Sequence, residues 1–88
     1  EDIKLLDFVQ LEQDYLKFRT ANNLVRIEAI ELFSVDGKRL YMNDNLVKDS
    51  NQYEIKVNQI KRNTLYFLRI ELSESNFKSS VIYKLISN

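Results

Sequence analysis

The sequence contains no cysteine, no histidine and no tryptophan. Without cysteine there is no disulfide, so the hydrophobic core alone must hold the fold together. Without histidine and cysteine, a zinc site would have to be built from carboxylates only, which is rare. Without tryptophan, the chain lacks the usual platform on which sugar rings stack. We therefore expect no cofactor and no metal, and a carbohydrate-binding role is disfavoured.

An excess of one charge sign and long apolar runs are also missing. The chain has 13 Lys and Arg residues and 13 Asp and Glu residues, so its formal net charge is zero. Proteins that bind a phosphate backbone usually carry a basic excess, so no nucleic-acid partner is expected. No apolar run approaches the roughly 20 residues that span a bilayer, so no membrane span is expected.

Length and apolar content indicate one compact domain. The 88 residues, of which 44% are hydrophobic, suffice for one core and no more. We therefore predict a single domain over residues 1–88. The chain begins at Glu1 with no signal-like segment, so we expect it to be a module of a longer polypeptide.

What the sequence has in quantity is period-two alternation, the pattern of half-buried β-strands. In residues 66–72 (YFLRIEL) the side chains at even positions are predicted to face the core. Residues 53–57 (YEIKV) repeat this pattern, and residues 30–35 (IELFSV) begin with it. Residues 81–86 (VIYKLI) predict a last strand that is apolar on both faces except at Lys84.

The first 28 residues allow two interpretations. Residues 8–11 and 15–18 are short apolar runs, and the polar residues 12–14 between them indicate a turn. Residues 5–18 also partly fit the 3.6-residue period of a helix. We favour two strands, because the rest of the chain alternates. Residues 25–27 are either a separate short strand or the start of the next one.

Turn-forming residues separate these runs. Clusters of Asn, Asp and Ser occur at residues 21–23, 43–45, 49–51 and 73–76. Asp36-Gly37 is the strongest hairpin signal, because a type I′ turn needs positive φ at its central positions. Six or seven short strands at roughly 10-residue spacing predict an all-β antiparallel sandwich.

No arrangement of residues indicates catalysis, which requires a nucleophile, a tuned acid or base, or a metal. Glu28 and Glu31 are three positions apart along an expected strand, so they should point to opposite faces, which is poor geometry for a carboxylate pair. Ser79 and Ser80, with neighbouring lysines, have no glycine nearby to form an oxyanion hole. We therefore predict that the domain is not an enzyme, whatever the activity of its parent protein.

The acidic loop residues do not indicate a metal site. Asp36, Asp44 and Asp49 are scattered, and no loop has the three alternating acidic ligands of a calcium site. Asp44 and Asp49 flank residues 46–48, and as a pair they are interpreted as solvated loop carboxylates.

Aromatic residues are abundant, with five Tyr and five Phe. Most should fill the layer between the sheets. Lys61 and Arg62 precede Tyr66 and Phe67, a mixture that superficially resembles a nucleic-acid stacking surface, but Tyr66 shares its face with core residues. Phe67 and Phe33 lie on the second face of their strands. They either form an exposed patch for a protein contact or are covered by a loop or the N-terminal segment.

An ordered set of motifs resembles a known family. Residues 30–40 (IELFSVDGKRL) resemble the "IeiYnllGklv" segment of C-terminal sorting domains of the type IX secretion system of Bacteroidetes bacteria. Residues 53–60 resemble the next strand of that family, residues 63–70 (NTLYFLRI) resemble its "pGiYfvki" segment, and residues 83–86 (YKLI) resemble its lysine-bearing final strand. Thr64 stands where the family has a glycine, so we expect this turn to close differently, because Thr does not readily adopt positive φ.

The resemblance implies an immunoglobulin-like sandwich of about seven short strands at the C-terminus of a larger exported protein. Such domains are read by the secretion apparatus at the outer membrane, and the cargo is then secreted or attached to the cell surface. The positions that match the family's motifs are Asp36, Gly37, Tyr66 and Lys84, and Lys78 adds a second cation to the final strand.

These positions are expected to have either a structural role or a role in recognition. Asp36 and Gly37 should close the hairpin, and Tyr66 should anchor the core with its hydroxyl at the rim. Lys78 and Lys84 should present positive charge on a final strand whose backbone can pair with a receptor strand if it lies at a sheet edge. The expected partner is a protein, either the secretion machinery or a neighbouring domain. The alternative function is a generic immunoglobulin-like accessory or spacer domain.

Overall fold

The structure is a computed structural model that describes residues 6–46 and 51–88. Predictions for Asp49 and for most of the turn at residues 49–51 lie outside the described residues. The strands, in chain order, are β1 (Leu6–Glu12), β2 (Tyr15–Thr20), β3 (Val25–Ser34), β4 (Arg39–Asn43), β5 (Gln52–Lys56), β6 (Leu65–Glu74) and β7 (Phe77–Ile86).

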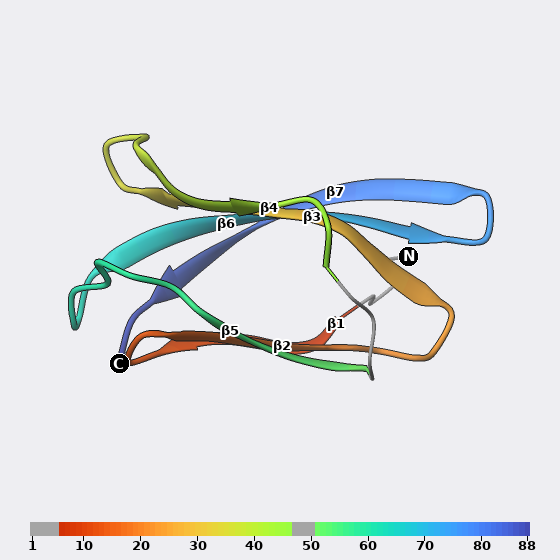
Figure 1. Ribbon diagram of the computed structural model, residues 1–88, viewed down its shortest axis with the longest axis horizontal. Coiled ribbons are helices and arrows are strands. Elements are labelled where there is room, and N and C mark those ends of the chain that lie inside the picture. Colours follow the sequence, from red (N-terminus) through yellow and green to blue (C-terminus); the bar gives the residue numbers. More distant parts are fainter. Residues whose placement is uncertain (1–5, 47–50) are drawn as a thin grey trace.

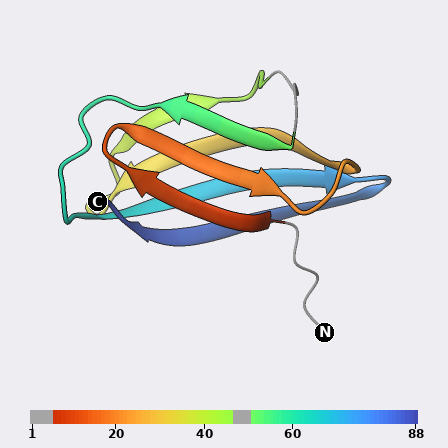
Figure 2. The same ribbon diagram turned by 90° about the horizontal axis from the view of Figure 1, so that it is seen from below.

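The strands form two antiparallel sheets that lie face to face (Figure 1). The three-stranded sheet has the order β1-β2-β5, and the four-stranded sheet has the order β4-β3-β6-β7. Seen from below, β1, β2 and β5 cover the strands of the larger sheet (Figure 2). The predicted all-β, immunoglobulin-like antiparallel sandwich of about seven short strands is confirmed.

The N-terminal part of the chain forms two strands, and the helical interpretation of residues 5–18 is wrong for the residues described. β1 and β2 pair through a two-residue turn between Glu12 and Tyr15. Gln13, the first residue of that turn, has a positive φ of 56°. Val25 begins the ten-residue strand β3, so residues 25–27 are the start of the next strand.

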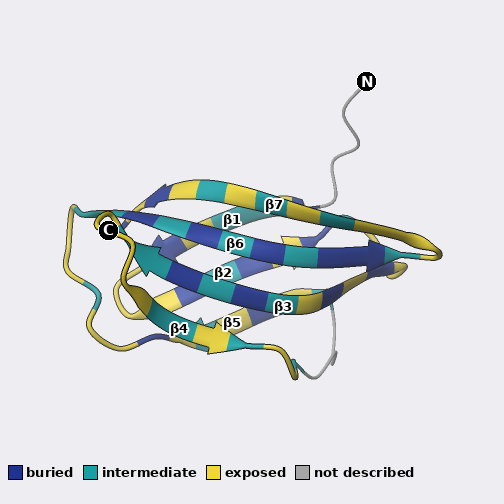
Figure 3. Ribbon diagram, turned by 90° about the horizontal axis from the view of Figure 1, so that it is seen from above, coloured by how far each residue is buried: buried dark blue, intermediate teal, exposed yellow. Residues whose placement is uncertain are grey.

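The core lies between the sheets, where buried and exposed residues alternate along the strands (Figure 3). Tyr66 is 3% exposed, and Leu68, Ile70 and Leu72 after it in β6 are almost completely buried, as the alternation predicts. Phe18 and Tyr53 stack across β2 and β5 with ring centroids 4.8 Å apart. Ile55 is only half-buried, since β5 is an edge strand.

A β-bulge in β3 overturns one prediction. The register between β3 and β6 shifts at Glu28, while Ile27 and Ile30 on either side are both buried. The extra residue resets the alternation, so Glu28 and Glu31 both lie on the surface that faces away from the core. The prediction that they point to opposite faces is therefore wrong. Glu28 accepts a 2.6 Å hydrogen bond from the hydroxyl of Ser73.

The hairpin at Asp36-Gly37 is confirmed, but its predicted turn type is wrong. Gly37 has a φ of 90°, whereas Asp36 is not among the non-glycine residues with positive φ. The N–H of Gly37 donates to the Ser34 carbonyl at 3.0 Å, and the N–H of Ser34 donates to the Lys38 carbonyl at 2.9 Å. This is a type I turn followed by a left-handed glycine, which needs positive φ at one position only.

The turn before β6 closes through Asn63. This residue has a φ of 54°, and its N–H donates to the carbonyl of Ser87 at 2.9 Å. Asn adopts the left-handed region more readily than Thr, because its short polar side chain can bond locally. The expectation that Thr64 does not take over the role of a glycine is confirmed.

The chain end links the two sheets. Ser87 is fully buried, and its N–H donates to the Thr64 carbonyl at 3.0 Å. Asn88 then turns to β1, where its N–H donates to the Leu11 carbonyl at 3.1 Å and its carbonyl accepts the N–H of Gln13 at 3.0 Å. The C-terminus accordingly lies beside the β1–β2 turn (Figure 1). We call Ser87 and Asn88 the C-terminal clasp.

Candidate recognition surface

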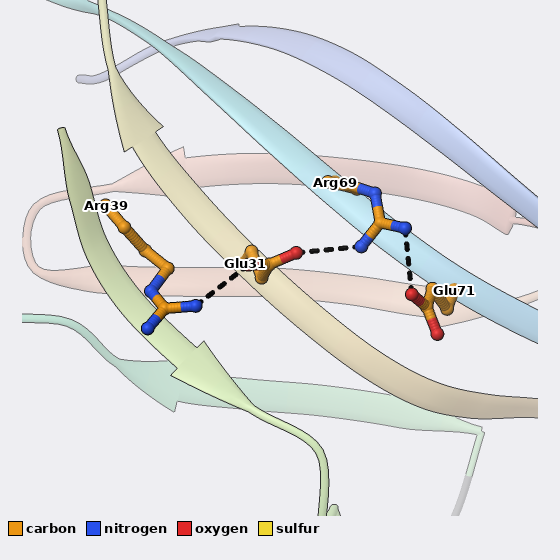
Figure 4. Close-up of polar contacts among 4 residues, drawn as sticks. All are labelled: Glu31, Arg39, Arg69 and Glu71. Carbon is orange, nitrogen blue, oxygen red and sulfur yellow. Dashed lines mark hydrogen bonds and ion pairs between the residues drawn. The ribbon is translucent and has the colours of Figure 1, made fainter. Parts of the chain in front are cut away.

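The surface of the four-stranded sheet that points away from the core, here called the outer face, contains a row of charged side chains (Figure 4). Glu31 in β3 contacts Arg39 of β4 at 3.2 Å and Arg69 of β6 at 2.7 Å. Arg69 also contacts Glu71 at 2.8 Å. The hydrogen bond from Arg39, followed by the one from Arg69, lowers the pKa of Glu31. Two carboxylates and two guanidinium groups thus neutralise one another.

Next to this row, the outer face has an apolar patch formed by Phe33, Val35, Phe67 and Ile82. Phe33 and Phe67 are direct cross-strand partners, and all four side chains line one shallow hollow. Val35 is 65% exposed and Ile82 is 67% exposed, whereas the two phenylalanines are half-buried. The patch is therefore exposed at Val35 and Ile82 and only partly exposed at Phe33 and Phe67.

β7 is an edge strand, with β6 as its neighbour on one side. The two-residue turn after Glu74 makes Glu74 and Phe77 a hydrogen-bonded pair, so the odd-numbered residues of β7 direct their backbone groups to β6. Ser87 continues this parity by donating to Thr64, and Asn88 has the opposite parity and bonds β1. The even-numbered residues of β7 therefore direct their N–H and C=O groups to the open edge.

The same even-numbered residues of β7 have exposed side chains: Lys78, Ser80, Ile82, Lys84 and Ile86. Within residues 6–46 and 51–88, no carboxylate forms an ion pair with either lysine. Lys84 lies opposite Phe67 of the apolar patch. Lys78 lies at the other end of β7 and shares a hollow with Glu28 and Glu71.

The residues proposed from the sequence do not form one site. Asp36 and Tyr66 line a hollow at one end of the sandwich, with Gly37 on the adjacent turn, whereas Lys78 and Lys84 lie on β7. Tyr66 is buried, and its hydroxyl accepts a 2.8 Å hydrogen bond from the N–H of Lys61. Its predicted role as a core anchor with a hydroxyl at the rim is confirmed.

Asp36 is held by the turn that it helps to form. The hydroxyl of Ser34 donates a hydrogen bond to its carboxylate, and this bond, followed by one from the backbone of Lys38, lowers the pKa of Asp36. The Ser34 hydroxyl in turn accepts the N–H of Lys38 at 3.2 Å. Asp36 and Gly37 thus shape the hairpin rather than present a free binding group.

No three Asp or Glu side chains in residues 6–46 and 51–88 come together in a way that could hold a metal ion. In the same ranges there is no helix long and apolar enough to cross a membrane.

Comparison with known proteins supports the fold. No protein-family model matches the sequence, and a search of curated proteins finds no significant match. The chain is similar in structure to CopC from Methylosinus trichosporium OB3b, with a TM-score of 0.65 and 11% sequence identity, over 92% of this chain and 85% of that one. At this identity the likeness concerns the β-sandwich fold alone.

Two features of the outer face were not evident from the sequence. The row through Glu31 and Arg69 joins residues that are distant in sequence, and it becomes visible only when β3 and β6 are known to be neighbours. Two of the four residues of the apolar patch could be predicted from the sequence, because the period-two pattern placed Phe33 and Phe67 on the face of their strands that points away from the core. Val35 and Ile82 complete the patch, and the available signal for Ile82 was its position two residues before Lys84, on the same face of the strand.

Proposed function

We propose that this domain is a C-terminal sorting module that the type IX export machinery recognises at the outer membrane, and that β7 is the strand that is read. The observation that carries this proposal is the position of β7 at a sheet edge with Lys78 and Lys84 exposed. Neither lysine forms an ion pair within the described residues, so both positive charges are available to a protein partner.

The positions that match the family's motifs divide into two groups. Asp36, Gly37 and Tyr66 maintain the hairpin and the core, so they support the fold. Lys84 makes no comparable structural contact within the described residues and projects from the outer face. A lysine in the final strand is therefore the motif position best suited to recognition, with Lys78 as a second cation. An exported location, at the cell surface or outside it, belongs to the same proposal.

The test is a fusion of this domain to an inert reporter with a general export signal, expressed in a bacterium that has a type IX system. We expect the fusion to reach the cell surface. The double variant Lys78→Glu/Lys84→Glu should lower surface delivery severalfold, because both charges that the partner reads are reversed. The matched control is Lys38→Glu/Lys56→Glu, which makes the same charge change at exposed positions away from β7.

Deleting residues 81–88 is not a suitable test, although it removes the strand of interest. That segment contains the buried residues Leu85 and Ser87 and the clasp residue Asn88, so its loss destabilises the sandwich. A fusion that stays in the periplasm with the unaltered domain contradicts the sorting role and supports the accessory or spacer role. Equal delivery by both double variants contradicts reading of β7.

A further inference from the structure

We infer that the partner of β7 is an extended protein segment of alternating apolar and acidic residues, which adds as a new strand to the open edge and extends the apolar patch at Ile82. This inference rests on the proposed function, because it specifies the partner of the same strand.

The backbone of β7 is suited to pair with an added strand. The N–H and C=O groups of its even-numbered residues point to the open edge, and an added strand pairs with groups of this kind. The side chains of the same residues are exposed on the outer face. A strand added here therefore brings its own side chains directly beside those of Ile82 and Lys84.

The described edge strands differ in length and in the regularity of their pairing. β7 pairs with β6 over ten residues without a register shift. β4 is five residues long and its pairing with β3 contains an irregularity, and β1 has an irregularity near Leu6. β5 is also five residues long. Short and bulged edges resist added strands, so β7 is the edge best suited to accept one.

The exposed side chains of β7 determine which residues a matching strand must carry. Ile82 and Ile86 are apolar and Lys84 lies between them on the same face. An antiparallel strand that matches them has an apolar residue, an acidic residue and an apolar residue at alternate positions. The apolar residue opposite Ile82 packs against Ile82 and so extends the apolar patch beyond β7. Lys78 contributes less, since it shares a hollow with three carboxylates, those of Glu28, Asp44 and Glu71.

A second copy of this chain does not fit the same edge. β7 contains no Asp or Glu between Phe77 and Ile86. Any pairing of two β7 strands therefore brings Lys78 and Lys84 of both copies into one edge without a carboxylate to neutralise them. The charge of the edge selects a partner strand of different sequence.

The test uses the isotope-labelled chain and a capped nonapeptide, VTETVTTTT, whose first, third and fifth residues lie opposite Ile86, Lys84 and Ile82 in antiparallel pairing. NMR titration should show shifts of the β7 amides and of Phe67. The reference peptide VTKTVTTTT should bind roughly fivefold more weakly, because a cross-strand charge pair becomes repulsive. For Lys84→Glu the preference should reverse, so that the lysine peptide binds better.

Proline substitution separates strand addition from simple charge attraction. Ser80 directs its N–H to the open edge, so Ser80→Pro removes a donor for the added strand without removing a β6–β7 hydrogen bond. We expect Ser80→Pro to lower the affinity for VTETVTTTT severalfold. Ser80→Ala, its matched control, should bind like the original chain. The NMR spectra also verify that both variants are folded.

The outcomes distinguish this inference from the proposed function. Shifts confined to another edge, no binding at millimolar peptide, or a charge preference unaffected by Lys84→Glu would overturn the inference. Dimerisation through β7 in sedimentation experiments would also overturn it, because the occupant would be a second copy. Peptide binding by a domain whose fusion does not reach the surface would leave the inference standing and refute the sorting role. Surface delivery without peptide binding would support the sorting role and overturn the inference.

Discussion

Tyr66 places an apolar ring in the core and a hydroxyl at its rim. The ring is 3% exposed, and the hydroxyl accepts the N–H of Lys61. Tyr66→Ala should lower the free energy of unfolding by about 3–5 kcal/mol, as for other aromatic truncations in cores. Tyr66→Phe removes only the hydrogen bond and should cost about 1 kcal/mol. Chemical denaturation measures both, and a loss below about 1 kcal/mol for Tyr66→Ala would contradict the anchoring role.

The charge of Asp36 makes the stability of the hairpin depend on pH. Because its pKa is lowered in the folded state, its stabilising effect is present above the ordinary Asp pKa and is lost as the pH falls through the lower, folded-state pKa. Asp36→Asn, which keeps the shape, should therefore be less stable than the original chain near neutral pH. The difference should shrink between about pH 5 and pH 2. Melting temperatures of both proteins over this range test it, and a constant difference would contradict it.

Among whole elements, strands with regular alternation could be predicted from sequence. In β6 the period of two identified which face is buried, because every inward position from Tyr66 to Leu72 is apolar. The bulge in β3 could not be predicted, because residues 25–32 contain no glycine or other local signal for an extra residue. The ion pair of Arg69 with Glu31 also depends on strand order, which alternation does not encode.

The structure of the last residues of the chain also could not be predicted from a local sequence pattern. Ser87 looks like a polar tail residue in the sequence, yet it is fully buried. Its hydroxyl accepts the N–H of Thr64 at 3.1 Å and donates to the Lys61 carbonyl. The clasp depends on contacts between segments more than 20 residues apart, so no local pattern reveals it.

The clasp predicts an asymmetry between Ser87, which directly follows β7, and Ser80, which lies within it. Ser87→Ala leaves the Thr64 N–H and the Lys61 carbonyl without their partner and should cost about 1–3 kcal/mol. Ser80→Ala changes an exposed side chain and should stay within about 0.5 kcal/mol. Urea denaturation of the two variants compares them directly. Equal stabilities would mean that water replaces the Ser87 hydroxyl without loss.

At the scale of the whole molecule, fold and recognition depend on different surfaces. The sandwich is shared with a protein of 11% identity, so many sequences satisfy the core. The candidate recognition features lie on the outer face and at the β7 edge. The sequence indicated Lys84 through the resemblance to a lysine-bearing final strand, with Lys78 as a second cation on that strand. It did not indicate that the neutralised row and the apolar patch lie side by side, because that depends on the order β4-β3-β6-β7.

The two sheets are joined by the core and by Asn88, whose backbone bonds Leu11 and Gln13. Deleting Asn88 removes both inter-sheet hydrogen bonds and should lower the free energy of unfolding by about 1–2 kcal/mol. Asn88→Ala keeps the backbone groups and should change it by less than about 0.5 kcal/mol. In hydrogen exchange, the Gln13 amide should exchange faster in the deletion variant only, while unfolding stays a single transition. If the deletion changed neither stability nor Gln13 exchange, the core alone would hold the sheets together, and the clasp would serve only to fix the end of β7.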